Sequence, residues 1–230
     1  MNKIGWIIFS AVVVLLLGGL IVWTRVSNPS VDVSKIDSNV VLKASAESGN
    51  IADHVEGKAD SKVILVEYGD FQCPSCGNAH PNVKALMEEY GDRIGLIFRN
   101  FPLTSIHPNA RAGAAAAEAA GLQDRFWDMH DLLYANRDSW INLDAAQRTD
   151  MFASFANQLG LDAAKFKTDY ASADVNKKIS FDIAVGKAKK VDATPTFFLN
   201  GEKLDEKTAG GIVQGDLTAV KAKFDKLLAE

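Results

Sequence analysis

Two cysteines three residues apart follow a short apolar run, and the chain contains no others. The run covers residues 63–66, and the pair forms the motif Cys73-Pro74-Ser75-Cys76. An unbroken apolar run with β-branched residues is typical of a strand buried on both faces, and proline is tolerated in the first turn of a helix. The pattern therefore predicts a strand that leads into a helix whose N-terminus faces the first sulfur. Free N–H groups and the helix dipole at that end favour a thiolate, the form of cysteine that attacks disulfides.

The same cysteine pair could supply half of a zinc site, which would need at least two further ligands. No second cysteine pair exists, and the four histidines lack the close pairing in sequence that is typical of such sites. A redox role is therefore favoured over a metal site. We expect the Cys73–Cys76 disulfide itself to be the redox group, with no metal and no other cofactor.

The composition is that of an ordinary globular protein. The chain has 230 residues, 47% of them hydrophobic, and a formal net charge of -4 with both signs mixed along the sequence. This length suits one or two domains. No basic cluster with interleaved aromatic residues is present, so nucleic acid is not expected as a partner.

The N-terminus carries a candidate membrane segment. Residues 4–23 form an uncharged apolar run between Lys3 and Arg25. At about 1.5 Å per residue such a run spans roughly 30 Å, the thickness of a bilayer core. A cleaved signal peptide is the alternative, but the run is longer than the apolar region of such a peptide, and no small-residue cleavage site follows closely. We therefore expect residues 1–25 to be a transmembrane signal-anchor that crosses the cell membrane once, with the rest of the chain on the extracytoplasmic side.

The remainder of the sequence divides into a linker and one folded domain. Residues 26–50 are rich in Ser, Val, Asp and Asn and show no helical or strand period, which predicts a flexible tether. The domain then covers residues 51–230, with a helical insertion at about 105–190. Strands are expected at residues 62–68, 94–98 and 196–199, a helix at 74–90, a hairpin turn at Asn200-Gly201 and a closing helix at 216–228. This order predicts an α/β fold interrupted by a helical insertion.

Two separated motifs resemble one protein family. Residues 63–76, which include the cysteine pair, resemble the active-site strand and helix of DsbA-like thiol:disulfide oxidoreductases. Residues 193–201 resemble the cis-proline loop of that family and the strand after it. Between them, residues 99–103 and 126–131 resemble the insertion of its membrane-anchored branch. The resemblance covers roughly residues 50–230 and implies a thioredoxin-like fold with an inserted helical subdomain.

The resemblance also implies roles for individual residues. Cys73 would be the exposed nucleophile, and Cys76 the buried cysteine that resolves the mixed disulfide. Pro195 would follow a cis peptide bond and face the sulfurs, which would turn the Thr194 backbone toward an extended substrate strand. A trans proline that opens a strand is the alternative.

Two further residues bear on the acidity of the cysteines. Glu67 is the one charge inside the predicted central strand, and burial there would raise its pKa. The resemblance makes it a proton acceptor for Cys76; a carboxylate at the strand end that reaches solvent or a lysine is the alternative. Ser75, which with Pro74 completes the active-site loop, stands where the strongest oxidants of the family carry histidine. We therefore expect a pKa for Cys73 between about 3.5 and about 8.5.

We expect the remaining polar residues near the motif to have structural rather than catalytic roles. His80 is expected on an exposed face of the cysteine helix, His107 at the start of the first insertion helix, and His130 in side-chain packing. Asp70 and Gln72 flank the motif without a role that the sequence assigns.

The first functional hypothesis is an enzyme that passes its Cys73–Cys76 disulfide to unfolded exported proteins with free thiols, through a mixed disulfide. An integral-membrane partner would reoxidise the dithiol, and a lipid bilayer anchor at residues 4–23 would raise the local concentration near that partner. The same dithiol could instead serve a disulfide reductase or isomerase, since residue chemistry does not fix the direction of electron flow. A noncatalytic thioredoxin-like binding module with a structural disulfide is the third hypothesis.

Overall fold

The structure is a computed structural model that describes residues 6, 10, 12–15, 18, 32–34 and 36–230. The chain divides into two compact units, Met1–Asp32 and Val33–Glu230. No helix within the described residues has the length and apolar character needed to span a membrane. Most of the predicted span at residues 4–23 lies outside the described residues.

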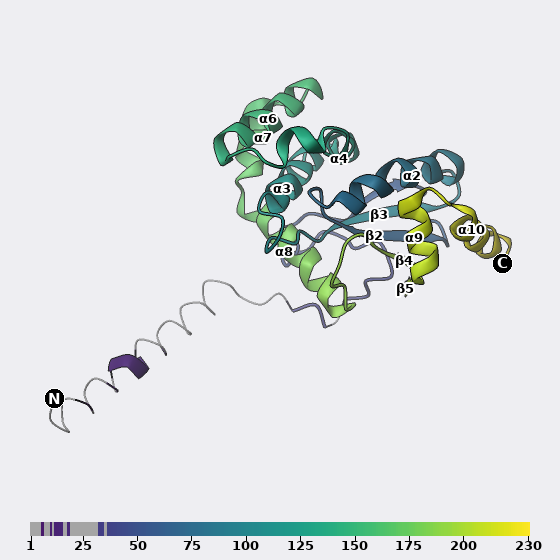
Figure 1. Ribbon diagram of the computed structural model, residues 1–230, viewed down its shortest axis with the longest axis horizontal. Coiled ribbons are helices and arrows are strands. Elements are labelled where there is room, and N and C mark those ends of the chain that lie inside the picture. The colour runs from purple at the N-terminus through teal and green to yellow at the C-terminus, as the bar shows by residue number, and fades with distance from the viewer. Residues whose placement is uncertain (1–5, 7–9, 11, 16–17, 19–31, 35) are drawn as a thin grey trace. The chain divides into compact units, whose positions relative to one another are not determined.

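A five-stranded mixed sheet forms the centre of the second unit, with the strand order β1-β3-β2-β4-β5 (Figure 1). The strands are β1 (His54–Gly57), β2 (Ile64–Gly69), β3 (Gly95–Asn100), β4 (Thr196–Leu199) and β5 (Glu202–Lys203). β2 pairs parallel with β3 and antiparallel with β4, and the β1–β3 and β4–β5 pairs are antiparallel. Both β2 and β3 are buried along their whole length, as their largely apolar sequences require. The strand that leads into the cysteine motif therefore lies in the middle of the sheet.

The hairpin turn between β4 and β5 forms where it was predicted. Asn200 and Gly201 have φ values of 48° and 83°, in the left-handed region that asparagine and glycine tolerate best. The Asn200 side chain also accepts a hydrogen bond from the Ile64 N–H at 2.8 Å, which ties the turn to the start of β2. The edge strand β1 was not predicted, because its four residues include a histidine and a glutamate and are too few to show a strand period.

Helices cover the sheet and build the insertion. Their bounds are α2 (Pro74–Tyr90), α3 (Ala110–Gly121), α4 (Phe126–Ala135), α5 (Arg137–Trp140), α6 (Ala145–Gln158), α7 (Ala163–Tyr170), α8 (Ala173–Ala188), α9 (Glu206–Gln214) and α10 (Thr218–Ala229). The expected helical insertion is present as α3 to α8, and Figure 1 shows α3, α4, α6 and α7 gathered at one end of the unit. The side chains of Asp144, Asp162 and Ser172 accept hydrogen bonds from backbone N–H groups and so fix the starts of α6, α7 and α8.

Helix α9 was missed in the sequence. It contains Gly210 and Gly211, and glycine disfavours a helix interior. Two observations explain why the helix forms in spite of them: Asp205 caps it by accepting the Thr208 N–H at 2.9 Å, and Ile212 is fully buried. Because α9 packs on α2, tertiary contacts and a good cap outweigh weak propensity.

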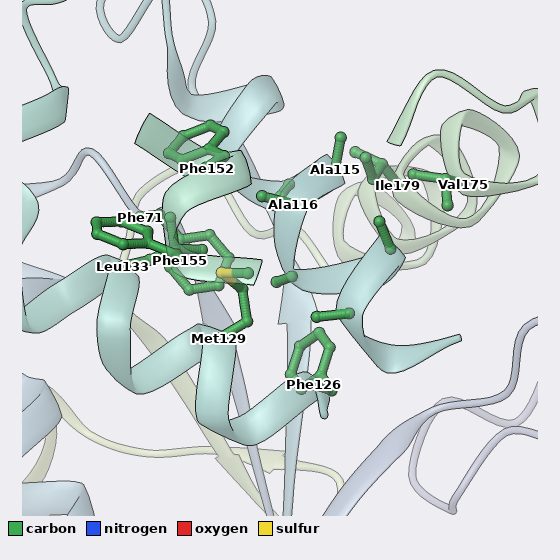
Figure 2. Close-up of a cluster of buried hydrophobic side chains, with 14 of the residues drawn as sticks. Phe71, Ala115, Ala116, Phe126, Met129, Leu133, Phe152, Phe155, Val175 and Ile179 are labelled. Carbon is green, nitrogen blue, oxygen red and sulfur yellow. The ribbon is translucent and has the colours of Figure 1, made fainter. Parts of the chain in front are cut away.

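Two hydrophobic cores share the sheet. One combines the insertion helices with Phe71 and both cysteines, and Figure 2 shows part of it, including the rings of Phe126 and Phe152. The other combines strands β2 and β4 with α2, α9 and α10. The cysteine motif therefore belongs to the core of the insertion, although α2, which it begins, packs mainly in the other core.

The segment before β1 is packed rather than flexible. The Arg99 guanidinium, fully buried in β3, donates hydrogen bonds to the carbonyl oxygens of Ser38 at 2.7 Å and Val40 at 3.0 Å. The predicted tether over residues 26–50 is therefore wrong for residues 36–50, and most of the rest of it lies outside the described residues. The physical reason is that these contacts use backbone carbonyls, which leave no apolar period in the sequence.

Candidate active site

The cysteine motif lies at the start of α2, as predicted. Cys73 is the N-cap of the helix, with extended φ and ψ of -67° and 125°, and Pro74 occupies the first turn. Both cysteines are free thiols. Cys76 is fully buried, whereas Cys73 keeps 6% of its surface exposed, less than the open nucleophile that the resemblance implies. The Thr194 carbonyl lies against the Cys73 sulfur and contributes to this cover.

The loop before β4 brings Thr194 and Pro195 to the sulfurs. The peptide bond between these two residues is cis, so the predicted cis proline is confirmed and the trans alternative is wrong. The Cys73 Sγ lies 3.2 Å from the Thr194 carbonyl oxygen, to which the protonated thiol, but not the thiolate, can donate a hydrogen bond. The antiparallel pairing of β4 with β2, in which Thr196 lies opposite Tyr68, produces this approach between residues far apart in the sequence.

The surroundings of the two thiols separate their acidities. The pKa of Cys73 is lowered to about 5, chiefly by a hydrogen bond from the Cys76 thiol, while burial opposes the shift. The Thr194 side chain lowers this pKa further, and its buried hydroxyl has no hydrogen-bond partner among the described residues. Burial raises the pKa of Cys76 well above that of a free thiol. Near neutral pH Cys73 is therefore the thiolate and Cys76 the protonated thiol, and the Cys73 value lies inside the expected range.

Glu67 lies in β2 with 3% of its surface exposed. Burial, with a smaller contribution from the charge of Cys73, raises its pKa to about 8. The alternative of a strand-end carboxylate that reaches solvent is therefore wrong. The charge of Glu67 in turn contributes to the raised pKa of Cys76. A carboxyl that titrates near neutral pH beside a buried thiol can accept or release a proton when the thiol changes state.

Two polar residues before the cysteine motif connect it to the insertion. The buried Asp70 carboxylate accepts the Gln72 N–H at 2.7 Å through one oxygen. Through its other oxygen it accepts the Leu103 N–H at 2.9 Å and pairs with His107 Nδ1 at 2.7 Å. His107 lies in the loop before α3 rather than at the start of that helix. Sequence reasoning gave Asp70 and Gln72 no role; their signal was a pair of polar positions directly before the cysteines.

A cluster of two histidines and an aspartate lies between α2 and α4. His80 is not on an exposed face as predicted, because its side chain is 15% exposed and its Nε2 lies 2.9 Å from Asp131 Oδ1. His130 is buried in packing, as predicted, with its Nδ1 3.2 Å from the same oxygen. The ligand atoms of these three residues lie within 4.8 Å of one another, so the group could hold a metal ion. Lys84 Nζ, 2.5 Å from Asp131 Oδ2, already supplies the carboxylate with a cation.

A surface hollow of about 440 Å³ lies beside the motif. Its lining comes from α2, α4, α5 and the residue between the last two, and includes Pro74, Asn78, Tyr134, Asn136, Arg137 and Ser139. The Asn78, Asn136, Arg137 and Ser139 side chains give this lining hydrogen-bonding groups.

Comparison with known proteins agrees with this arrangement. The chain matches the family model described as thioredoxin over residues 49–213. It is 40% identical over 151 residues to the Na(+)/H(+) antiporter NhaA 1 of Salinispora arenicola, which covers 66% of this chain and 22% of that protein. It is 37% identical over 153 residues to the Na(+)/H(+) antiporter NhaA 1 of Mycolicibacterium gilvum, which covers 66% of this chain and 24% of that protein. The chain thus spans less than a quarter of the length of these curated relatives.

Solved structures share the fold. BdbD from Bacillus subtilis is similar with a TM-score of 0.62 and 20% sequence identity, over 83% of this chain and 98% of that one. Alpha-DsbA1 from Wolbachia pipientis has a TM-score of 0.62 and 21% identity, over 77% of this chain and 91% of that one. MdbA, a thiol-disulfide oxidoreductase from Corynebacterium diphtheriae, has a TM-score of 0.58 and 18% identity, over 79% of this chain and 96% of that one. The chain belongs to the thioredoxin family, and its fold is that of the DsbA-type thiol-disulfide oxidoreductases.

Proposed function

We propose that the chain is a protein thiol:disulfide oxidoreductase that donates a Cys73–Cys76 disulfide to other proteins. The observation that carries the proposal is the contrast between the two thiols at one helix start. Cys73 is acidic and keeps 6% of its surface exposed, with a pKa lowered to about 5 chiefly by the Cys76 thiol. Cys76 is fully buried, and burial raises its pKa. A stable thiolate on the reactive cysteine and a protonated resolving cysteine are what a disulfide donor needs in its reduced state.

The first step forms a mixed disulfide. A substrate thiolate attacks Cys73 Sγ of the oxidised pair, the Cys73–Cys76 bond breaks, and the electron pair leaves on Cys76. Because burial disfavours the charge on Cys76, this sulfur must take up a proton. Glu67, whose pKa burial raises to about 8, holds a proton near neutral pH and is the group that supplies it.

The second step releases the oxidised substrate. A second substrate thiolate attacks the substrate sulfur of the mixed disulfide and expels Cys73 as a thiolate. The low pKa of Cys73 makes it a good leaving group. The substrate has then lost two electrons to form its disulfide, and the Cys73–Cys76 pair has gained them. The backbone at Thr194, next to Pro195, would hold the substrate as an added strand during both steps.

A reductase or isomerase that uses the same dithiol is the second candidate, and Thr194 before the cis proline favours it, because threonine also occurs there in isomerase-type sites. The reduction potential separates the two. A value above about -200 mV supports a donor of disulfides, and a value near about -270 mV supports a reductase. Equilibration of the pair with glutathione buffers measures it.

The extracytoplasmic side of a membrane is the proposed location, with residues 4–23 as anchor and an integral-membrane protein as reoxidant. The uncharged apolar run supports the anchor. The names of the curated relatives support proximity to a membrane protein, because a segment similar to this chain occurs within chains named as antiporters. Unfolded exported proteins with free thiols would be the substrates.

Oxidative refolding of a reduced, unfolded protein tests the proposal. The oxidised wild-type chain is expected to introduce disulfides, whereas Cys73→Ser is expected to be inactive because the mixed disulfide cannot form. Cys76→Ser cannot form the Cys73–Cys76 disulfide and should also be inactive as a donor, but its Cys73 thiolate should still form a mixed disulfide when oxidised glutathione is added, with release of one reduced glutathione. A wild-type chain no faster than Cys73→Ser would contradict the proposal and favour a noncatalytic binding module.

A further inference from the structure

Arg137, the first residue of α5, binds the residue before the reactive cysteine. Its Nε and Nη2 both donate hydrogen bonds to the Gln72 carbonyl oxygen, at 2.9 Å and 2.6 Å. We propose that Arg137 is a positioning residue that stabilises the Cys73 thiolate and so makes the Cys73–Cys76 disulfide more oxidising. This role rests on the proposed function and deepens it, because it assigns a residue outside the motif to the strength of the oxidant.

The arginine side chain lies against the first turn of α2. A Cβ placed on Gly77 would lie 3.3 Å from Arg137 Cδ, so glycine at this position leaves room for the arginine side chain. Cys73 is the N-cap of the same helix, and the Gln72 carbonyl belongs to the peptide unit that joins it to Cys73. Arg137 therefore holds a positive charge at the helix end whose dipole is already positive, and both favour a thiolate there.

The charge of Arg137 remains effective at this position. Its side chain is 18% exposed, and its one acidic partner in the described chain is Asp138, whose oxygen lies 2.8 Å from Nη1 and whose side chain is 91% exposed. Water strongly screens an ion pair as exposed as this one. The part of the guanidinium that faces α2 is less exposed, so its charge is less screened at the start of that helix. Arginine also keeps its charge at every accessible pH. Since Ser75 brings no charge to the motif, Arg137 supplies the missing cation.

The insertion fixes the position of Gln72 from other directions as well. The Gln72 side chain accepts the Asn109 N–H at 2.6 Å and donates to the Ile141 carbonyl at 2.8 Å. Both partners, like Arg137, belong to the inserted segment between β3 and β4. The peptide unit before Cys73 therefore cannot rotate away from Arg137 without breaking contacts with the insertion. The inserted helices thus tune the chemistry of a motif that belongs to the thioredoxin-like core.

The test compares Arg137→Gln with Arg125→Gln in the full-length chain. Arg125 lies in the same insertion, has an exposed guanidinium and pairs with Asp128 at 2.6 Å, so its replacement removes an equal charge away from the dithiol. The readouts are the ultraviolet absorbance of the Cys73 thiolate against pH and the equilibrium with glutathione. We expect Arg137→Gln to weaken the acidity of Cys73 on the order of tenfold, which corresponds to a potential about 30 mV more negative. Arg125→Gln should match the wild type.

Two further variants separate positioning from a general loss of structure. Arg137→Lys keeps the charge but not the paired hydrogen bonds, so its acidity should lie between those of the wild type and Arg137→Gln. Asp138→Asn removes the partner carboxylate and should shift the acidity of Cys73 in the opposite direction. Equal acidities in Arg137→Gln and Arg125→Gln, or shifts of the same sign in Arg137→Gln and Asp138→Asn, would overturn the proposal. A wild-type chain that oxidises no substrate would overturn the proposed function instead, while the thiolate titration would still report on Arg137.

Discussion

Two groups of buried ionisable residues in the same sheet have opposite charge arrangements. In the group around Arg99, each acidic side chain has a basic partner: Arg99 Nη2 lies 2.7 Å from Asp53 Oδ2, and Lys178 Nζ lies 2.6 Å from Asp182 Oδ1. In the group around the dithiol, Glu67 forms no ion pair with any described residue and shares its surroundings with two sulfurs that can also become negative. The first group is compensated and the second is not.

The consequence appears in their pKa values. Burial raises the pKa of Asp53, but the charges of Lys178 and Arg99 outweigh burial and the net shift is downward. Glu67 is equally buried, has no such partner, and has a pKa raised to about 8 by burial. Burial beside two cations therefore keeps Asp53 a permanent ion, whereas burial outweighs the single cation beside Asp182 and raises its pKa to about 6. Burial without any cation gives a group that titrates near neutral pH and can take part in proton transfer.

The largest expected effect comes from breaking the compensated group. Arg99→Met would leave the Asp53 carboxylate without one cation and the buried Ser38 carbonyl without its donor. Removing one partner of a buried ion pair costs about 3–5 kcal/mol, and we expect a loss of that size in the free energy of unfolding. Urea unfolding measures it, with Arg93→Met as control, because the Arg93–Asp92 pair is exposed and should contribute at most about 1 kcal/mol. A similarly small loss of unfolding free energy in both variants would show that the buried ion pairs around Arg99 do not stabilise the fold in the way that this comparison requires.

The next effect concerns Glu67, the uncompensated carboxyl. Here the substitution should raise the free energy of unfolding rather than lower it. Because burial raises the folded-state pKa of Glu67 from 4.5 to about 8, the folded chain holds a proton that the unfolded chain loses between these values. The stability that this proton contributes is complete below pH 4.5 and is lost as pH rises toward 8. Glu67→Gln cannot titrate at this position. Its free energy of unfolding should therefore rise relative to that of the wild type by about 1.4 kcal/mol for each unit that the pH increases within this window.

Urea unfolding of the disulfide form at several pH values checks this, since oxidation removes the titration of Cys73. Other groups that titrate in the same window, such as Asp182 with a pKa raised by burial to about 6, are common to both chains and cancel in the difference. A stability difference between Glu67→Gln and the wild type that does not change with pH would show that Glu67 is compensated after all.

The smallest expected effect comes from one hydroxyl at the dithiol. Thr194→Val removes a group that lowers the pKa of Cys73 but keeps the carbonyl against the sulfur. We expect the acidity of Cys73 to fall by less than about tenfold, because a single neutral hydrogen bond contributes about 1 kcal/mol. Thr196→Val is the matched control, since the Thr196 hydroxyl donates to the Ala193 carbonyl rather than to a cysteine. Equal thiolate titrations in the two variants would show that the Thr194 hydroxyl does not affect the acidity of Cys73.

Features with a local pattern could be predicted from the sequence. The strand and helix around the cysteines, the Asn200-Gly201 turn and the burial of Glu67 follow from neighbouring residues and elementary rules of turn and strand chemistry. The cis bond before Pro195 came from resemblance to a family and was confirmed by the structure. These elements also define most of the proposed catalytic machinery, because a strand and the helix after it carry the cysteines and Glu67.

The features that could not be predicted depend on partners far apart in the sequence. Lys178 lies 125 residues after Asp53, yet their side chains meet at 3.2 Å. In the sequence each looks like an ordinary surface charge. The same holds for Arg137, whose contact with Gln72 spans 65 residues and makes it part of the site only through the folding of the insertion. Residues 36–50 were mistaken for a tether because their contacts with Arg99 use backbone carbonyls, which no side-chain pattern reveals.

The most direct test is a titration of the Cys73 thiolate in the reduced wild-type chain and in Glu67→Gln. The wild type should show a midpoint near pH 5 for Cys73 and a second, smaller change near pH 8 as the Glu67 carboxyl loses its proton. Glu67→Gln should keep the first and lose the second. A single midpoint near about 8.5, the value of a free thiol, in both chains would contradict an uncompensated buried site poised for disulfide exchange.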